Sequence, residues 1–450
     1  MGIFLIVLSL ILLVVLVFKN VPIFFASLIS SIFCLLTAQL FTGGISVIAG
    51  MTSTARLADS TQASSFIFGL ANYFGNYFWM FTLGAMFGKL YEVTGAANSI
   101  ANLIVEKLGA KAAVPAIILV GFILTYGGVS VFVCFFALYP LMLSLFKEAD
   151  ISRRLIPAFY FAGAGTATGW LPGSPQLQNT IPGDALGVGY SAALIPGWIA
   201  GIVEMVLVFA WIYWCVAHAK KKGEHFEVTE ADQKEIDRLN ALGKLPGFLQ
   251  SILPMIVLLV VLNFTKLGAP VSLFIGVLAA IVIFFNFIEW SKFWDTLKGG
   301  LMGGVTSLFN TASVVGFGAV VQNTPAFGTI INVLTGISGS PVVVGSLATA
   351  VMAGVCGSGT GGEGIALPIV KEYFVPAMSA KQIQGFARIC ALSALTLDSL
   401  PHCGLVVTVI DYSGNNHKSS YMEAGVTNVV IPIITLIVVL FPLCAMFGYL

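Results

Sequence analysis

Charge is scarce in this chain of 450 residues. Asp, Glu, Lys and Arg make up only 9% of it, whereas 58% is hydrophobic and the mean hydropathy is +0.97. A soluble core cannot enclose that much apolar surface, so the composition predicts a protein that is dissolved in lipid. The net charge of +1 and the pI near 7.5 exclude a basic nucleic-acid-binding face as the organising feature, and we expect no nucleic-acid partner.

The sequence also lacks paired cysteines and common catalytic motifs. Its seven cysteines form no C-x-x-C pair and nearly all lie in apolar segments, so neither a disulfide framework nor a metal site is predicted. The motifs H-E-x-x-H and G-x-S-x-G do not occur. We therefore expect no enzyme and no cofactor other than a coupling ion.

Apolar segments of membrane-spanning length follow one another along the chain. Each uninterrupted run has about the 17 to 25 residues that cross a bilayer roughly 30 Å thick. We expect an all-α integral membrane protein with about ten crossings, multi-pass in the inner (plasma) membrane. The expected crossings are residues 2–18, 22–40, 66–88, 155–190 (interrupted), 192–217, 248–264, 268–288, 301–322, 382–413 (interrupted) and 426–449.

Two further segments, 112–146 and 341–377, do not read as simple crossings. Each has two apolar arms around a Gly-rich turn, which predicts a re-entrant helical hairpin. Each half of the chain then holds five crossings and one hairpin, and an odd number of crossings makes the repeats inverted. We place the first repeat at 1–217, a cytoplasmic linker at 218–247, where Lys residues gather, and the second repeat at 248–450.

Helix-breaking signals recur at matching positions in the two halves. Pro172 and Pro401 are 229 positions apart, and each follows a Gly-rich hairpin turn. Backbone freed from a helix at membrane depth is tolerated only where protein buries it or a cavity is wetted, so the paired breaks predict a substrate site. The candidate substrate-binding residues are Tyr126, Gly127, Gly128, Ser130, Thr168, Pro172, Gly173, Ser174, Gln176, Gly357, Ser358, Gly359, Thr360, Ser399 and Pro401.

Helix ends at these breaks would favour an anion. The first turn of a helix presents unpaired N–H groups and the positive end of the helix dipole. The two hairpin turns and the two breaks would supply four such ends. If they converge, they predict a site for a small carboxylate. Nearby hydroxyl and amide groups, among them Thr125, Thr166, Gln178, Asn179 and Thr408, could bond the hydroxyls of a substrate. In the alternative interpretation these side chains only satisfy backbone groups freed at the kinks.

Few ionisable residues fall within the apolar segments. Glu363 lies in the second hairpin turn, and Asp398 and His402 are spaced i, i+4 across the second break. A buried carboxyl beside a histidine can load and release a proton near neutral pH, so these three residues are the candidates for proton coupling. Alternatively, Asp398 only caps a half-helix. Arg388 either pairs with a carboxylate or lines an outer vestibule. Glu204 is a secondary candidate.

Several runs resemble those of the gluconate permease family (GntP) of the ion transporter superfamily, and within it the 3-hydroxybutyrate permease branch. They are YGGVSVFVCFFALYPL from Tyr126, LPGSPQLQNTIP from Leu171, GSGTGG from Gly357 and LDSLPHCGLVVT from Leu397. The resemblance implies a proton-coupled carboxylate symporter, a homodimer and an elevator movement of a transport part that carries the hairpins and broken helices.

This sequence departs from the pattern of that family at three places. Gluconate-type members carry an acidic residue in the first hairpin, whereas residues 129–136 here have none, which favours a shorter and less hydroxylated acid. Cys403 stands where Asn is usual, and Glu363 enlarges the second turn. A sodium-coupled carboxylate symporter of similar fold remains the alternative, because carbonyls at 357–362 and the hydroxyls of Ser358 and Thr360 could bind Na⁺.

Overall fold

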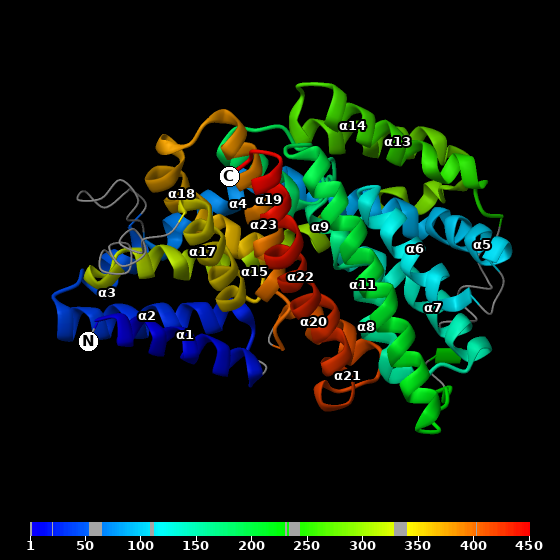
Figure 1. The fold of residues 1–450 in the computed structure, drawn as a ribbon, viewed down its shortest axis with the longest axis horizontal. Coiled ribbons are helices and arrows are strands. Elements are labelled where there is room, and N and C mark those ends of the chain that lie inside the picture. The colour runs from blue at the N-terminus through cyan, green and yellow to red at the C-terminus, as the bar shows by residue number, and fades with distance from the viewer. Residues whose placement is uncertain are drawn as a thin grey trace.

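The computed structural model describes residues 2–19, 21–53, 65–108, 112–229, 232–233, 244–327, 340–401 and 403–450, and these ranges contain helices and no strand. His402 lies outside the described residues. Figure 1 shows the arrangement of the helices. The first half of the chain contains α1 (Gly2–Phe18), α2 (Ile23–Thr42), α3 (Val47–Thr52), α4 (Phe66–Val93), α5 (Ala96–Leu108), α6 (Ala113–Tyr126), α7 (Val131–Ala149), η2 (Arg153–Leu155), α8 (Ile156–Ala164), α9 (Ala167–Trp170), α10 (Leu177–Leu186) and α11 (Leu194–Lys221).

The second half is also helical. It contains α13 (Phe248–Phe264), α14 (Gly268–Ile283), η3 (Phe285–Phe287), η4 (Trp290–Lys292), α15 (Phe293–Gln322), α17 (Pro341–Cys356), α18 (Gly359–Phe374), η5 (Val375–Ala377), α19 (Ala380–Leu397), α20 (Gly404–Tyr412), α21 (His417–Gly425), η6 (Val426–Val430), α22 (Ile431–Ile434), η7 (Thr435–Leu440) and α23 (Phe441–Met446). Helices thus occupy each predicted span.

Within the described ranges, four helical stretches are long and apolar enough to cross a membrane. They are Ile23–Thr42, Leu194–Lys221, Trp290–Gln322 and His417–Met446, and shorter apolar helices include α1, α13 and α14. Helix α15 contains the predicted crossing 301–322 and begins before it, at Phe293, and glycines on this helix pack against α4. A Cβ atom placed on Gly300 would lie 2.7 Å from the Cα atom of Met86, and one on Gly304 would lie 2.7 Å from the carbonyl of Phe81. These two glycines therefore allow α15 and α4 to approach each other closely.

The last predicted span also begins earlier, since α21 to α23 form one continuous column from His417. Segments η6 and η7 of this column are π-helical. The column runs beside α11, with α22, η7 and α23 in contact with it (Figure 1). Single-turn π segments are frequent at functional sites, so this column bears on the site described below.

Proline and glycine end the helices where the sequence predicted breaks. In the first half α9 ends at Trp170, Gly173 has a φ of +83°, and helical structure resumes only after Gln176. Pro172 and Pro175 within that break cannot donate to a helical ladder. In the second half α19 ends at Leu397 and α20 begins at Gly404. The positive φ angles of Gly128 (+104°) and Gly357 (+58°) turn the chain between α6 and α7 and between α17 and α18.

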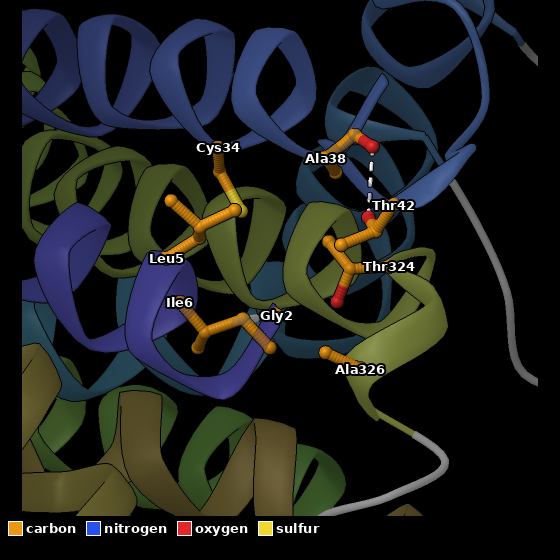
Figure 2. Close-up of a pocket in the computed structure, with 8 residues that line it drawn as sticks. All are labelled: Gly2, Leu5, Ile6, Cys34, Ala38, Thr42, Thr324 and Ala326. Atoms are coloured by element: carbon orange, nitrogen blue, oxygen red, sulfur yellow. Dashed lines mark hydrogen bonds between the residues drawn. The ribbon is translucent and has the colours of Figure 1, made fainter. Parts of the chain in front are cut away.

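A small pocket lies away from these breaks, between α1, α2 and the segment after α15 (Figure 2). Its lining is mostly apolar: Gly2, Leu5, Ile6, Cys34, Ala38, Thr42, Thr324 and Ala326. Thr42 satisfies its hydroxyl locally by donating to the carbonyl of Ala38 at 2.8 Å. The pocket has no convergent polar groups that would recognise an acid, so it is not the candidate site.

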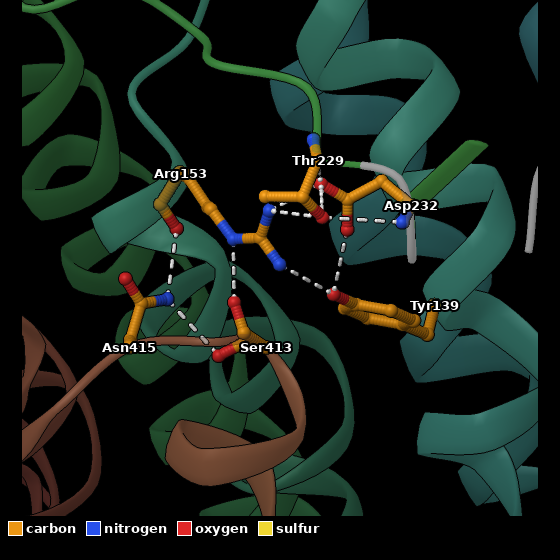
Figure 3. A network of polar contacts seen from close by, with 6 residues as sticks. All are labelled: Tyr139, Arg153, Thr229, Asp232, Ser413 and Asn415. Atoms are coloured by element: carbon orange, nitrogen blue, oxygen red, sulfur yellow. Dashed lines mark hydrogen bonds and ion pairs between the residues drawn. The ribbon is translucent and has the colours of Figure 1, made fainter. Parts of the chain in front are cut away.

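The linker between the halves is anchored by Arg153 at the start of the first broken helix (Figure 3). Its guanidinium forms an ion pair with Asp232 of the linker and donates to the carbonyl of Ser413, beyond α20, at 2.6 Å. Tyr139 of α7 also contacts this guanidinium, at 3.2 Å. One arginine therefore joins the linker to elements of both halves.

Candidate functional site

The first hairpin turn and the first break are held together by side-chain hydrogen bonds. Gln176 donates from Nε2 to the carbonyls of Thr125 at 2.6 Å and Val129 at 3.0 Å. The hydroxyl of Tyr126 donates to the carbonyl of Pro172 at 2.9 Å. The turn that follows α6 therefore contacts the break that precedes α10.

Gly173 fits into this arrangement without a side chain. A Cβ atom at Gly173 would lie 3.1 Å from both the Tyr126 hydroxyl and the Asn263 Oδ1 atom. Asn263 of α13 also donates to the carbonyl of Gly173 at 3.0 Å. The sequence analysis did not identify Asn263, although an amide within an apolar span is a signal that could have been used.

The second hairpin turn and the second break meet at Asp398. A Cβ atom at Gly359 would lie 3.0 Å from Asp398 Oδ2 and 3.3 Å from the carbonyl of Ala394. Ser399 donates from its hydroxyl to Asp398 Oδ1 at 2.9 Å. Gly359, the first residue of α18, therefore lies so close to the Asp398 carboxyl group that any larger side chain would press against it.

The two breaks also contact one another. The same Cβ position at Gly359 lies 3.4 Å from Cγ of Gln178 in α10, and one at Gly169 would lie 2.7 Å from Cδ1 of Leu395 in α19. Helix α10 packs against both α18 and α19. Both broken helices and the second hairpin therefore converge, and the first hairpin joins them through the first break.

Most polar candidates of the first half are bonded to backbone carbonyls. Thr168 donates to Ala164 at 3.0 Å and Ser174 donates to Thr168 at 2.5 Å. Thr125, Thr166 and, in the second half, Thr408 each donate to the carbonyl four residues earlier. For these residues the alternative interpretation, in which hydroxyls satisfy freed backbone groups, describes the observed conformation.

The second hairpin turn carries polar groups with fewer backbone contacts. The Ser358 and Thr360 hydroxyls lie 3.2 Å apart, and Ser358 also accepts from the Gly361 N–H at 3.3 Å. Tyr73 of α4 donates to the carbonyl of Thr360 at 3.1 Å. The hydroxyls of this turn therefore bond to one another and to a backbone N–H of the same turn.

Two carboxyl groups are buried at this second turn. Glu363 is fully buried, and within the described residues neither of its carboxyl oxygens has a hydrogen-bond partner. Asp398 is 8% exposed. Neither makes an ion pair with a described residue. Buried carboxyls without a cation favour the protonated form, because desolvation penalises the charge.

Arg388 fits neither of the two roles considered for it. It is 2% exposed, and its guanidinium donates to neutral acceptors at the first break, with no carboxylate partner among the described residues. These acceptors are Asn179 Oδ1 at 2.6 Å, the carbonyls of Tyr190 at 3.0 Å and Ala192 at 3.1 and 3.0 Å, and the carbonyl of Trp170. All five N–H donors are used, so Arg388 fixes the backbone after the first break.

Three residues beside the second break were not identified from the sequence. His417 contacts the carbonyl of Pro401 through Nε2 at 2.8 Å, so a histidine outside the candidate set lies at this break. Tyr421 donates to the carbonyl of Ser399 at 3.1 Å, and Asn428 donates to the Ser399 hydroxyl at 3.2 Å. An Asn within the apolar stretch 426–449 was a usable signal, whereas the contact of His417 depends on tertiary structure.

Three helix starts at the hairpin turns and breaks have no side-chain cap. No side-chain cap bonds the first turn of α7 at Ser130, of α10 at Gln176 or of α20 at Cys403. Such N–H groups attract carboxylates. The described residues contain no cluster of three or more His, Cys, Asp or Glu side chains that could hold a metal ion. Each of the described candidates is buried or half-buried.

The helical architecture and the long apolar helices are those of a membrane protein. A family model described as "GntP family permease" matches residues 1–443. The chain belongs to this family of permeases.

Curated relatives agree with this membership. An "Uncharacterized transporter YxjC" of Bacillus subtilis is 30% identical over 407 residues, which is 80% of this chain and 85% of that protein. The "High-affinity gluconate transporter" of Escherichia coli is 26% identical over 66% of each chain. A "Gluconate permease" of Bacillus licheniformis is 31% identical over 31% of this chain and 30% of that protein.

Proposed function

We propose that the chain is a proton-coupled symporter of a small organic carboxylate such as 3-hydroxybutyrate or a gluconate-like hydroxy acid. The observation that carries the proposal is the convergence at Gly359. This glycine abuts Asp398 of the second break and Gln178 of the first broken helix, so helix ends from both halves face one region. Substrate sites of transporters built from repeats lie at such a meeting of broken helices.

The uncapped helix starts support an anionic substrate. The first turns of α7, α10 and α20 supply N–H groups and positive dipole ends, and Arg388 adds a buried positive charge behind the first break. The guanidinium donors are all engaged, so its charge acts on the site without contacting the substrate. Two of the relatives are named for gluconate, which is itself a hydroxy acid.

The first hairpin favours a short acid. Residues 129–136 contain no acidic side chain, in contrast to the gluconate-type pattern, and the hydroxyls around the first break are bonded to backbone carbonyls. A substrate with many hydroxyls would therefore find few partners on that side. This reasoning supports the 3-hydroxybutyrate branch over sugar acids.

Asp398 and Glu363 are proposed to bind the coupling proton together with His402. Both carboxyl groups are buried next to the converging helix ends and have no cation beside them in the described ranges. Taking up a proton would make their burial less costly and would allow the loaded site to cross the membrane. Ser399 and Asn428 hold Asp398 in place through a chain of hydrogen bonds.

We further propose ten crossings, two re-entrant hairpins and an inverted repeat. The pairs α6–α7 and α17–α18, each joined by a short turn, support the hairpins, and the matching order of breaks supports the repeat. The glycine-packed pair α4–α15 would belong to a scaffold against which the hairpins and broken helices move as an elevator. A homodimer in the inner (plasma) membrane completes the proposal.

A sodium-coupled symporter is the second candidate. The Ser358 and Thr360 hydroxyls, the carbonyls of that turn and two carboxyl groups offer the oxygen ligands that Na⁺ would need. Protons and sodium ions would use the same residues. The two candidates therefore differ in the gradient that drives uptake and not in the location of the site.

Binding of a carboxylate is tested by calorimetry on the purified protein. We expect 3-hydroxybutyrate or gluconate to bind, and the corresponding neutral amide not to compete, because an amide carries no charge for the helix ends. Equal binding of acid and amide would contradict the anion site. The Gly84→Ala variant serves as a control, because nothing lies within 4 Å of a Cβ atom placed there.

A further inference from the structure

A third carboxyl group is buried at the first break, on α11. Glu204 is fully buried, and its Oε2 atom accepts a hydrogen bond of 2.7 Å from the indole N–H of Trp170. Its other oxygen, Oε1, has no hydrogen-bond partner in the part of the chain that the structure describes. Trp170 is the last residue of α9, so this carboxyl contacts the residue directly before the break.

One face of α11 packs against consecutive residues at the first break. Cβ atoms at Gly197 and Gly201 would lie 2.5 Å from Cγ of Pro172 and 2.4 Å from Cδ2 of Leu171, and Glu204 contacts Trp170. Residues at these i, i+4 and i+7 positions share one side of a helix. Glu204 therefore lies on the face of α11 that packs tightly against the first break. A movement of the break would change the surroundings of the Glu204 carboxyl group.

Trp170 also connects Glu204 to Arg388. Its indole N–H donates to the carboxyl group, and its backbone carbonyl accepts from the Arg388 guanidinium. A residue that holds a buried acid on one side and a buried cation on the other can relay a change of charge to the backbone of the break. A movement of Trp170 would alter the surroundings of both groups together.

Few other titratable groups surround Glu204. The elements packed closely against α11 contribute Tyr126 from α6, Tyr160 from α8 and Cys444 from α23, and residues of these types are neutral near pH 7. Helix α22 and the π-helical segment η7 contribute no titratable group, although η7 buries the Thr435 hydroxyl without a partner among the described residues. Arg388, beyond Trp170, is the charged group that reaches this break.

We propose that Glu204 is a second proton-carrying residue, positioned at the first break and coupled to it through Trp170. An ionised carboxylate here would leave Oε1 charged, buried and unbonded, so the neutral acid is the form that fits this conformation. When the break moves, Glu204 would return that proton to solvent. The proposal rests on the proposed proton-coupled transport, and it adds a proton site in the first half to Asp398 and Glu363 in the second.

Infrared difference spectroscopy of the purified full-length protein after a pH jump tests this assignment without a gradient. A protonated carboxylic acid has its own carbonyl stretch, and we expect Glu204→Gln to remove one such band that Asp398→Asn leaves in place. Trp170→Phe should keep the band and shift it to higher frequency, because the indole donor is lost. This second variant also serves if Glu204→Gln fails to fold.

Identical acid bands in the wild type and Glu204→Gln would overturn the proposal, since Glu204 would then neither take up nor release a proton in the pH jump. An unshifted band in Trp170→Phe would overturn the coupling to the break. If the wild type shows no proton-driven uptake while Glu204→Gln still loses its band, the proposed function fails and the protonation of Glu204 stands. A flattened pH profile of uptake in Glu204→Gln would support both.

Discussion

The guanidinium of Arg388 donates a hydrogen bond of 2.6 Å to the side-chain oxygen of Asn179, and this contact joins residues 209 positions apart in the chain. It links α19 of the second half to α10 of the first. Together with its bonds to the carbonyls of Tyr190 and Ala192, it fixes the segment that follows the first break. The two halves therefore meet through a buried cation as well as through apolar packing.

Replacement of Arg388 tests this role. Arg388→Met leaves several buried acceptors without a donor, each at a cost of about 1–3 kcal/mol, so we expect a loss of at least ~3 kcal/mol in stability. Arg388→Lys keeps the charge with fewer donors and should be intermediate. Thermal unfolding in detergent measures both, with the exposed Lys371→Met as control. An Arg388→Met variant as stable as the wild type would show that this network does not hold the break.

Gly359 tests the convergence of the site. In Gly359→Ala the new Cβ would lie 3.0 Å from Asp398 Oδ2, in the region where the helix ends converge, so we expect substrate binding weakened roughly tenfold or more, which is ~1.4 kcal/mol. Gly84→Ala is the matched control in an open part of α4. Unchanged affinity by calorimetry would place the substrate elsewhere. Gly173 is a less specific probe, because its φ of +83° would strain any replacement.

Removal of the buried charges should separate coupling from binding. We expect Asp398→Asn and Glu363→Gln to abolish accumulation against a gradient while equilibrium exchange of substrate persists, because a carrier with fixed protonation can still move loaded substrate. His402→Gln should behave in the same way. Counterflow and gradient-driven uptake in proteoliposomes measure the two processes. If these variants accumulate substrate with an unaltered pH profile, another residue, such as Glu204, must carry the coupling proton.

Glu224 of the linker gives a pH-dependent prediction. The Arg154 guanidinium bonds to Glu224 at 2.6 Å and holds the pKa of that carboxyl below its ordinary value of 4.5. A depressed pKa stabilises the fold above pH 4.5, and this contribution is lost as the pH falls through the lowered pKa. At pH 7, Glu224→Gln should therefore lose about 1 kcal/mol or less of its free energy of unfolding. Its unfolding temperature should be lower than that of the wild type.

In acid the two melting temperatures should converge, because the wild-type carboxyl is then protonated as well. Glu227→Gln is the control, since this side chain is exposed and lies in the same segment. A gap between wild type and Glu224→Gln that stays constant from neutral to acid pH would show that the lost charge is not the cause.

Local signals allowed the helices and their interruptions to be predicted. Pro172 and Pro401 remove backbone donors, and Gly128 and Gly357 adopt positive φ, so these residues end helices wherever the chain goes. Apolar runs likewise marked the spans. Helix α15 contains the whole predicted crossing 301–322 and begins before it, because a helix can continue beyond its apolar stretch.

The partners of the site residues could not be predicted. Arg388 was expected to meet a carboxylate or a vestibule, and it binds carbonyls about 200 positions away, near the first break. His417 and Asn428 reach the second break only because the last helical column folds back beside it. Such contacts depend on tertiary structure, and a single sequence does not encode them in any local pattern. His402, a candidate of the sequence analysis, lies outside the described residues.

Uptake of a labelled small carboxylate into proteoliposomes is the most direct test of proton-coupled transport. With a proton gradient and no sodium, we expect accumulation by the wild type, collapse on addition of a protonophore, and no accumulation by Asp398→Asn. Uptake that requires a sodium gradient and ignores the proton gradient would contradict proton coupling and establish the sodium-coupled alternative.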